Sequence, residues 1–346
     1  MKSTSIISWV RRQKKVHSKV NTSSTMRVGI VHTAGSPCGC AEAVAGGLAA
    51  LGHATLIVDS EEILLRSEEL AATCDLVIDH TDTFLGWGVL RPFVRGELER
   101  WGARVVGSST QACFLADDKI AAKGSLSAAG VPTPPGAAIT EVTAELPLWL
   151  QPPLILKPAC EHMSRGVTLA KTREEARVAI GVLLESYCQP VLVETFIPGR
   201  ELAVSVLESP EGLEVLPVLE WLSDDNEYRI LTAAFKLQEN GAAREDAHRI
   251  ILSSVQRHEL ESLSRKAFRA LGLRDYARFD VRLSPEGRFY FLEANTTPSL
   301  ETGEALAFSA RWAGLDYVHL VKRLLEVAQR RYCADSRTNK TVIANY

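Results

Sequence analysis

The segment from Arg278 to Asn295 constrains the fold most, because its pattern predicts two adjacent strands joined by a tight turn. Two runs of alternating residues flank Ser284-Pro285-Glu286-Gly287, where proline presets φ and glycine tolerates a positive φ. A regular four-residue turn would place Glu293 opposite Arg278, with Asp280 diagonal to Glu293. The sequence therefore predicts an antiparallel hairpin in the last quarter of the chain.

The two faces of this hairpin differ in chemistry, because side chains alternate across a strand with a period of two. In the expected register one face is apolar and carries Phe279, Val281, Tyr290 and Leu292, and the other carries Arg278, Asp280, Glu293 and Asn295. Carboxylate and amide oxygens, completed by water and phosphate oxygens, are what Mg²⁺ prefers when it accompanies a nucleotide. The polar face is thus either a set of solvated cross-strand ion pairs or a metal site beside a fixed positive charge.

The N-terminal part of the chain has the order strand, helix, strand. The expected elements are a strand at 26–32, a helix at 41–51 and strands at 55–58, 75–79 and 104–106. Strand, helix and strand at this spacing form a βαβ unit, and the parallel sheet it builds binds ligands at the carboxyl ends of its strands. We expect a Rossmann-like α/β domain over residues 26–110.

The rest of the chain alternates helices and strands around a proline-rich break at Val131–Gly136. Expected helices span 110–129, 174–186, 259–271 and 317–331, and expected strands span 153–157, 191–194 and 201–207. We predict further units at 111–190 and 191–333, between a basic tail at 1–25 and a polar, disordered tail at 334–346. A chain of 346 residues suits two or three domains.

Charge and cysteine content exclude some classes of function. The formal charge of −3 is spread unevenly, because residues 1–25 contain basic but no acidic side chains. That segment fits a transit peptide, a disordered tail or a start codon placed too early. The acidic remainder does not suit nucleic-acid binding, and no apolar run is long enough to span a membrane. The seven cysteines include one close pair, Cys38 and Cys40, which lacks the C-x-x-C spacing of a zinc or redox site, so we expect reduced thiols in a cytoplasmic protein.

Lysines offer the first signal of phosphate binding. Lys157 ends the apolar run Leu-Ile-Leu, where a charge would be costly unless it met an anion. Lys119 and Lys236 are further candidates, although a lone lysine is usually a solvated surface residue.

Several motifs together are similar to a known family. They are PLILKP, a loop closing on Ser164-Arg165-Gly166, PVLVETFIPGRE, RFDVRL and FLEANTTP, preceded by VVGSS and ADDKIAAKGSLSAAGVPTP. In order and spacing they resemble the ATP-grasp ligases of the D-alanine–D-alanine ligase type over about residues 26–332. The resemblance implies an ATP-grasp fold, in which two α+β subdomains at 111–190 and 191–333 clasp ATP behind the Rossmann-like domain.

The resemblance also implies roles for individual residues. ATP contacts are implied for Lys119, Lys157, Glu194, Thr195, Phe196, Ile197, Glu201 and Lys236, and metal ligation for Asp280, Glu293 and Asn295. Catalytic roles are implied for Arg278, Lys236 and Ser164, and contacts on the substrate side for His80, Ser299 and Glu304. Such an enzyme would use ATP with Mg²⁺, or Mn²⁺ in its place, to phosphorylate a carboxylate that an amine then attacks. Amino acids as substrates and a homodimer are implied in the same way.

The chain departs from the family pattern at substrate positions. Met163 stands where a serine of a Ser-Tyr-Glu set is expected, Leu237 replaces the tyrosine, and Glu304 replaces a serine that binds the acceptor carboxylate. The Gly-rich loop after the first strand is replaced by residues 32–37, with Glu42 as a candidate for its glutamate. Three alternatives stay open: D-alanine–D-alanine ligation, a specialised ligase such as those of mycosporine-like amino acids, and an ATP-binding regulator without catalysis.

Overall fold

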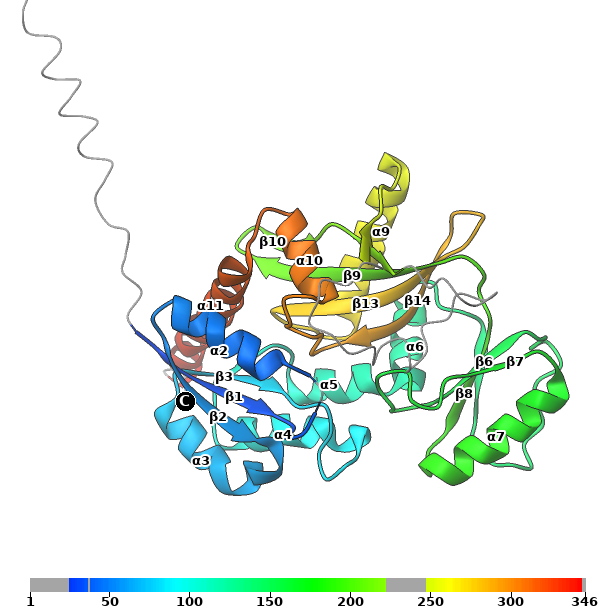
Figure 1. Cartoon of the computed structure of the whole chain (residues 1–346), viewed down its shortest axis with the longest axis horizontal. Helices are drawn as coiled ribbons and strands as arrows, with labels where there is room; N and C mark the ends of the chain where they lie inside the picture. The colour runs from blue at the N-terminus through cyan, green and yellow to red at the C-terminus, as the bar shows by residue number, and fades with distance from the viewer. Residues whose placement is uncertain (1–24, 37, 222–246, 344–346) are drawn as a thin grey trace, which may run out of the picture.

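The computed structural model describes residues 25–36, 38–221 and 247–343, with side chains as far as residue 334. The described chain forms three sheets that lie side by side, each covered by helices (Figure 1). The expected basic tail, Pro37, Lys236 and Leu237 fall outside the described residues. Within them, no helix combines the length and apolar character needed to cross a membrane.

The first sheet is parallel, with strand order β2-β1-β3-β4, which confirms the Rossmann-like expectation. Its strands are β1 (Arg27–His32), β2 (Ala54–Asp59), β3 (Leu76–His80) and β4 (Val105–Val106). Helices α2 (Cys40–Ala50) and α11 (Tyr317–Ile343) pack on one face, and α3 (Ile63–Thr73) and α4 (Arg91–Arg100) pack on the other. Two short 3-10 turns, η1 (Ser60–Glu62) and η2 (Gly88–Leu90), precede α3 and α4. The carboxyl ends of β1 and β3 therefore meet at one edge of this sheet.

The second sheet is antiparallel, with the order β5-β8-β6-β7. Its strands are β5 (Gly136–Ile139), β6 (Leu154–Pro158), β7 (Thr168–Ala170) and β8 (Val191–Thr195), and α7 (Arg173–Tyr187) covers one face. The hydroxyl of Thr172 caps α7 by accepting from the Glu175 N–H, and two glutamates in the first turn suit the helix dipole. Because β8 pairs with β5 and β6, the boundary expected at 190/191 lies instead between β8 and the next strand.

The third sheet is the largest and is antiparallel, with the order β12-β11-β9-β13-β14 and β10 beside β9. Its strands are β9 (Arg200–Ser209), β10 (Gly212–Val215), β11 (Leu219–Trp221), β12 (Ala247–Arg249), β13 (Tyr276–Leu283) and β14 (Phe289–Asn295). Helix α9 (Ser254–Ala270) packs on one face, and α10 (Ala305–Trp312) packs on the other. The central strands β9 and β13 are the most buried part of this unit.

The helix expected at 110–129 is two helices, α5 (Thr110–Asp117) and α6 (Lys119–Ala128). Asp118 leaves the helical conformation and its carboxylate accepts from the N–H groups of Ile120 and Ala121, so it caps α6. Both helices bury alanines and leucines against the third sheet rather than the second. This segment therefore belongs with the third sheet, and Lys119 becomes the first residue of a helix.

The hairpin of β13 and β14 differs from its expected register. The pairs are Arg278 with Asn295 and Asp280 with Glu293, and the register shifts between Asp280 and Val281. A bulge of this kind adds one residue to one strand and moves every later side chain to the other face. The core face consequently takes Phe289 and Phe291 in place of Tyr290 and Leu292. The polar face keeps all four of its expected members.

The closing helix also differs from expectation. It continues to Ile343, so residues 334–343 are helical rather than disordered. No glycine or proline interrupts the segment, and the backbone hydrogen bonds can therefore propagate. Arg331 on this helix bonds the fully buried Asp275 at 2.8 Å, and Asp275 also accepts from the Gly107 N–H at 2.7 Å. The buried carboxylate thereby joins α11, the start of β13 and the end of β4.

Candidate active site

The polar face of the β13–β14 hairpin gathers a guanidinium, two carboxylates and an amide. Arg278 Nε and Nη2 donate to Asp280 at 2.7 and 3.1 Å, and Asn295 Oδ1 accepts from the Thr297 N–H at 3.1 Å. Burial alone would lower the pKa of Arg278, but the Asp280 and Glu293 carboxylates outweigh it and raise the pKa. The arginine is therefore a permanent positive charge beside paired hard oxygen donors.

Two lysines, the buried Lys157 and the partly buried Lys123, hold the buried Glu194 on the central strands of the second sheet. Glu194 Oε2 lies 2.7 Å from Lys157 Nζ, and Glu194 Oε1 lies 2.6 Å from Lys123 Nζ. Burial opposes the charge on Lys157 and on Glu194, yet their mutual attraction raises the pKa of the lysine and lowers that of the glutamate. Lys123 was not among the predicted site residues, although its spacing from Lys119 on one helix face was a usable signal.

Lys119 occupies the N-terminus of α6, where its backbone N–H donates to Ala159 O at 2.9 Å and its ammonium donates to Glu161 O. Burial lowers the pKa of Lys119, with Glu293 acting against that effect. Among the described residues no carboxylate lies within ion-pair distance of this ammonium. Since Lys119 and Lys157 also influence each other electrostatically, two buried cations lie near the Glu293 carboxylate.

The segment after β6, which we call the phosphate loop (residues 159–166), has an unusual backbone. Met163 and Ser164 both have left-handed conformations, with φ of 55° and 58°, which cost about 1–2 kcal/mol each for residues other than glycine. Gly166 follows at φ 72°, where a Cβ would lie 2.7 Å from Pro158 Cγ. Strained backbone of this kind is concentrated at ligand-binding loops.

His162 in the phosphate loop lies 3.7 Å from Asp117, which in turn is paired with the buried Arg91. Burial first, and then Arg91, lower the pKa of His162 to about 3, so the imidazole is neutral near pH 7. Arg91 Nη2 also donates to Thr296 at 3.3 Å, just after β14. The sequence assigned a role to none of these three residues, because their meeting depends on how distant segments pack.

The residues expected to contact the nucleoside lie at the end of β8, in the segment after it and at the start of β9. The N–H groups of Thr195 and Phe196 are bonded to Pro135 O and Pro153 O, at 2.8 and 3.0 Å. Arg282 lies 3.5 Å from Glu201 and stacks over the Phe196 ring at 5.2 Å, and Ile197 is partly buried beside them in the chain. Gly199 is required at φ 122°, since a Cβ would meet Leu283 O at 2.1 Å. Arg282 was not predicted, because its partners Glu201 and Phe196 lie on segments far from it in the sequence.

The carboxyl ends of β1 and β3 bring together a group we call the thiol cluster: Cys38, Cys40 and His80. The sulfur of Cys40 lies 3.3 Å from Ser299 Oγ and accepts from the Leu300 N–H at 3.3 Å. Hydrogen bonding with Cys38 lowers the pKa of the Cys40 thiol to about 3 and raises that of Cys38. Burial would lower the pKa of His80, but the Cys40 sulfur outweighs it and raises the pKa.

The other substrate-side predictions are placed as follows. Glu304 is the residue before α10. Its carboxylate contributes to the raised pKa of Arg278, so a cation lies within its electrostatic range. Glu42 lies exposed in the first turn of α2 rather than with the thiol cluster. We expected reduced thiols and no metal site at the C-x-C pair, because its local spacing differs from that of a zinc or redox site. That argument could not include His80, which lies far away in the sequence at the end of β3.

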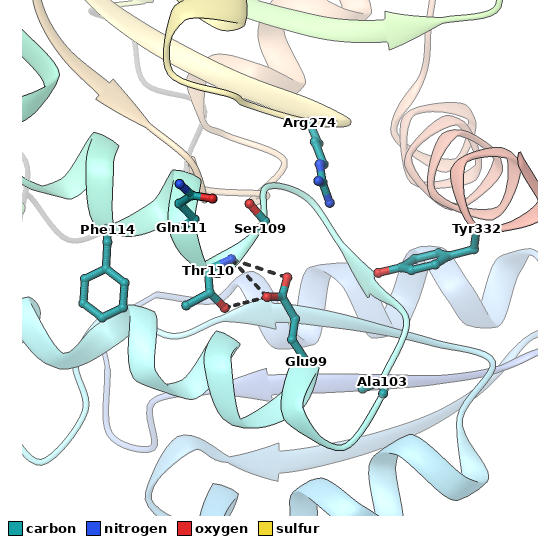
Figure 2. A pocket seen from close by; sticks show the side chains of 9 residues that line it. Glu99, Ala103, Ser109, Thr110, Gln111, Phe114, Arg274 and Tyr332 are labelled. Carbon is teal, nitrogen blue, oxygen red and sulfur yellow. Dashed lines mark hydrogen bonds between the residues drawn. The ribbon is translucent and has the colours of Figure 1, made fainter. Parts of the chain in front are cut away.

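A cavity of about 810 Å³ lies apart from all of these groups (Figure 2). Glu99 in its wall accepts from the Thr110 hydroxyl at 2.7 Å, and Arg274 and Tyr332 approach it from the loop before β13 and from α11. It is lined by Glu99, Gly102, Ala103, Ser109, Thr110, Gln111, Phe114, Arg274 and Tyr332. None of the predicted site residues belongs to this lining, so size alone does not locate the chemistry.

Comparison with known proteins agrees with the motifs. Residues 132–326 match the family model described as D-ala D-ala ligase C-terminus. The protein y4sG of Sinorhizobium fredii is 32% identical over 308 residues, which cover 84% of this chain and 88% of that one. The D-alanine–D-alanine ligase of Synechococcus sp. is 32% identical over 290 residues, covering 81% and 85%.

Solved structures show the same fold. The D-alanine–D-alanine ligase from Bacillus anthracis complexed with ATP superposes with a TM-score of 0.71 at 21% identity, covering 90% of this chain and all of that one. The VanG D-Ala:D-Ser ligase from Enterococcus faecalis gives 0.70 at 19% identity, covering 88% and 99%. The ATP-grasp expectation is thereby confirmed. The chain belongs to the D-alanine–D-alanine ligase family of ATP-grasp ligases, enzymes that form carbon–nitrogen bonds.

Proposed function

We propose that the chain is an ATP- and Mg²⁺-dependent ligase that phosphorylates a substrate carboxylate and joins the resulting acylphosphate to an amine. The observation that carries this proposal is the pair of buried ammonium groups, Lys119 and Lys157, near the carboxylate of Glu293. A buried cation without an anionic partner is costly, so Lys119 in particular favours a bound anion. A nucleotide phosphate supplies one.

The residues of the hairpin fit a magnesium ion. Asp280 and Glu293 lie directly opposite each other on one face, and each ionised carboxylate offers about four lone-pair sites. Asp280 can therefore keep its Arg278 hydrogen bonds and still ligate a metal, while Asn295 contributes an amide oxygen. Mg²⁺ bound there would neutralise phosphate charge and orient the triphosphate.

The protein's own groups support phosphoryl transfer by position and charge. Lys119 and Lys157 would bind phosphate oxygens, and Arg278 would stabilise charge on the transferring group. The phosphate loop, with Ser164 and Gly166, would fold over the nucleotide and exclude water from the acylphosphate. The N–H of Ser299 would support the tetrahedral intermediate of amine attack. Lys236, outside the described residues, stays a prediction for the γ-phosphate.

Substrate choice rests on a different set of residues. The alanine-specific pattern is broken at Met163, Leu237 and Glu304, whereas the thiol cluster lies beside Ser299. This composition supports an amino acid or amino-acid-like substrate other than D-alanine. A homodimer and a cytoplasmic location stay predictions.

The test is Mg²⁺-dependent release of ADP from the purified full chain. We expect no release with ATP alone, and release when a carboxylate donor and an amine acceptor are added from a panel of amino acids of both hands. Formation of the dipeptide with D-alanine alone would reject the specialised substrate and keep the ligase. A folded protein that binds ATP but yields no ADP with any pair would reject the ligase and select a regulator.

A further inference from the structure

The thiol cluster has the composition and placement of a metal site, although no motif in the sequence encodes one. One ligand atom from each of Cys38, Cys40 and His80 lies within 4.8 Å of the other two. Bond lengths of about 2.3 Å to sulfur and about 2.0 Å to nitrogen put tetrahedral ligand atoms roughly 3.5–3.8 Å apart. The ligand atoms would therefore need to move together by no more than about 1.3 Å around an ion.

The surroundings of the cluster suit an ion with sulfur ligands. His80 is buried, and its Nε2 has no hydrogen-bond partner among the described residues. The Leu300 N–H donates to the Cys40 sulfur at 3.3 Å, a contact that would persist with a metal thiolate. Around Cys38, its N–H donates to Ser36 Oγ at 3.2 Å, and Ser36 in turn donates to Asp82. Cys38 is thus tied through Ser36 to Asp82 before any ion binds.

We propose that Cys38, Cys40 and His80 bind one divalent cation of the zinc class, and that its fourth coordination position is left for water or substrate. Across the described parts of the chain, no fourth histidine, cysteine or carboxylate lies within the same distance of all three. Three protein ligands with an open position are typical of catalytic rather than structural zinc sites. Binding requires both sulfurs as thiolates and a neutral imidazole, so the protons held by the cluster pass to solvent.

The cluster faces the substrate side of the proposed reaction. Ser299 lies 3.3 Å from Cys40, and Gly39 between the two cysteines donates its N–H to Glu301 at 3.0 Å. Ser299 and Glu301 follow Asn295 in the loop after β14, so one segment joins the hard oxygen donors to the residues that contact the thiol cluster. A cation here would hold a carboxylate or amine of the substrate, a role that rests on the proposed ligase function. The binding of the cation does not rest on it.

The test uses the full chain, purified reduced and freed of metal, and titrated with Co²⁺ in the presence of excess Mg²⁺. We expect one cobalt per chain, with near-ultraviolet sulfur-to-cobalt charge-transfer absorption that Zn²⁺ abolishes. Cys40→Ser and Cys38→Ser should each weaken Zn²⁺ binding, which competition with a chromophoric chelator measures. The loss of a residue that only hydrogen-bonds a metal ligand costs about 10- to 100-fold in affinity, and we expect the loss of a ligand to cost at least as much. Cys188→Ser, which alters an exposed thiol elsewhere, is the matched control and should bind as the unchanged protein does.

Either of two results would overturn the proposal. One is cobalt binding without charge-transfer absorption, or with the same absorption in Cys40→Ser as in the unchanged chain. The other is recovery of a Cys38–Cys40 disulfide that persists in cell extracts and excludes metal. Cys38 is only partly buried, so Cys38→Ser tests the ligands even if Cys40→Ser does not fold. ADP release measured on the same samples separates the two proposals, because metal binding can fail while ligase turnover persists.

Discussion

The phosphate side and the thiol cluster are neighbouring regions built from opposite kinds of ligand. On the phosphate side, burial acts to lower the pKa values of Lys119 and Lys157, and Glu293 acts to raise them. Arg278 is bonded to Asp280, which pairs with Glu293. The thiol cluster instead offers two sulfur atoms and an imidazole nitrogen as ligands. Hard oxygen ligands suit Mg²⁺ and phosphate, whereas thiolates select softer ions. From this difference we expect the reaction type and the substrate choice of this chain to depend on separate groups of residues.

The largest effect is expected from Glu293→Gln, which removes one metal-binding charge without changing size. We expect kcat for ADP release to fall by about 10²–10³-fold, as when a preorganised electrostatic contact is lost. Glu286→Gln, at the exposed turn of the same hairpin, is the control and should leave kcat unchanged. Steady-state ADP release with varied Mg²⁺ measures both. Turnover in Glu293→Gln close to that of the unchanged protein would contradict the magnesium assignment.

The next effect is expected from Lys157→Met, which removes a buried ammonium from the phosphate side. We expect ATP affinity to fall by about 10- to 100-fold, equivalent to roughly 1.5–3 kcal/mol for a hydrogen bond to a charged group. The substitution also leaves Glu194 paired with Lys123 alone. Calorimetry with a non-hydrolysable ATP analogue measures the change, with the exposed Lys171→Met as control. Cobalt binding at the thiol cluster should not change, and a change there would break the separation of the two regions.

A third prediction contrasts the two histidines through the pH dependence of stability. The pKa of His162 is lowered to about 3, so the unfolded chain binds its proton first as the pH falls below 6.5. The unfolding free energy should therefore decrease by roughly 1–2 kcal/mol between pH 6.5 and about pH 5. His162→Gln should remove this decrease in urea denaturation.

His80 should act with the opposite sign in the metal-free protein. Because its pKa is raised, its contribution is present at acid pH and is lost as the pH rises through the raised value. Denaturation curves for His80→Asn against pH would check this. A parallel response of the two histidines would show that their surroundings do not differ as the structure indicates.

The smallest effect is expected from Ser299→Ala, at the contact between the two regions. The hydroxyl accepts from the Glu301 N–H at 3.2 Å, so its loss should cost about 0.5–1.5 kcal/mol of stability. ADP release should persist, because the proposed contribution to catalysis comes from the backbone N–H. Thermal unfolding and turnover measured together check both parts. Loss of turnover in a stable Ser299→Ala protein would assign the role to the hydroxyl instead.

Local patterns predicted the secondary structure well for elements whose own sequence shows a clear alternation or apolar run. The parallel strands of the first domain, the strand ending at Lys157 and the two strands of the hairpin all lie where alternation and apolar runs placed them. The exceptions have identifiable causes. Asp118 caps a new helix within a continuous helical pattern, and the bulge beside Asp280 shifts the later residues by one. The expected register assumed one unbroken alternation along the second strand, whereas an added residue reverses the alternation on one side of the bulge.

Motifs within short segments were enough to predict the family, the order of the elements and the side chains suited to phosphate. The tertiary structure alone decided which distant side chains meet. It placed Lys123 and Lys157 on one carboxylate, Arg91 beside Asp117, and His80 beside two cysteines from another loop. The physical reason is that pairing of buried charges and ligands depends on how sheets and helices pack, and packing joins residues whose separation along the chain carries no pattern.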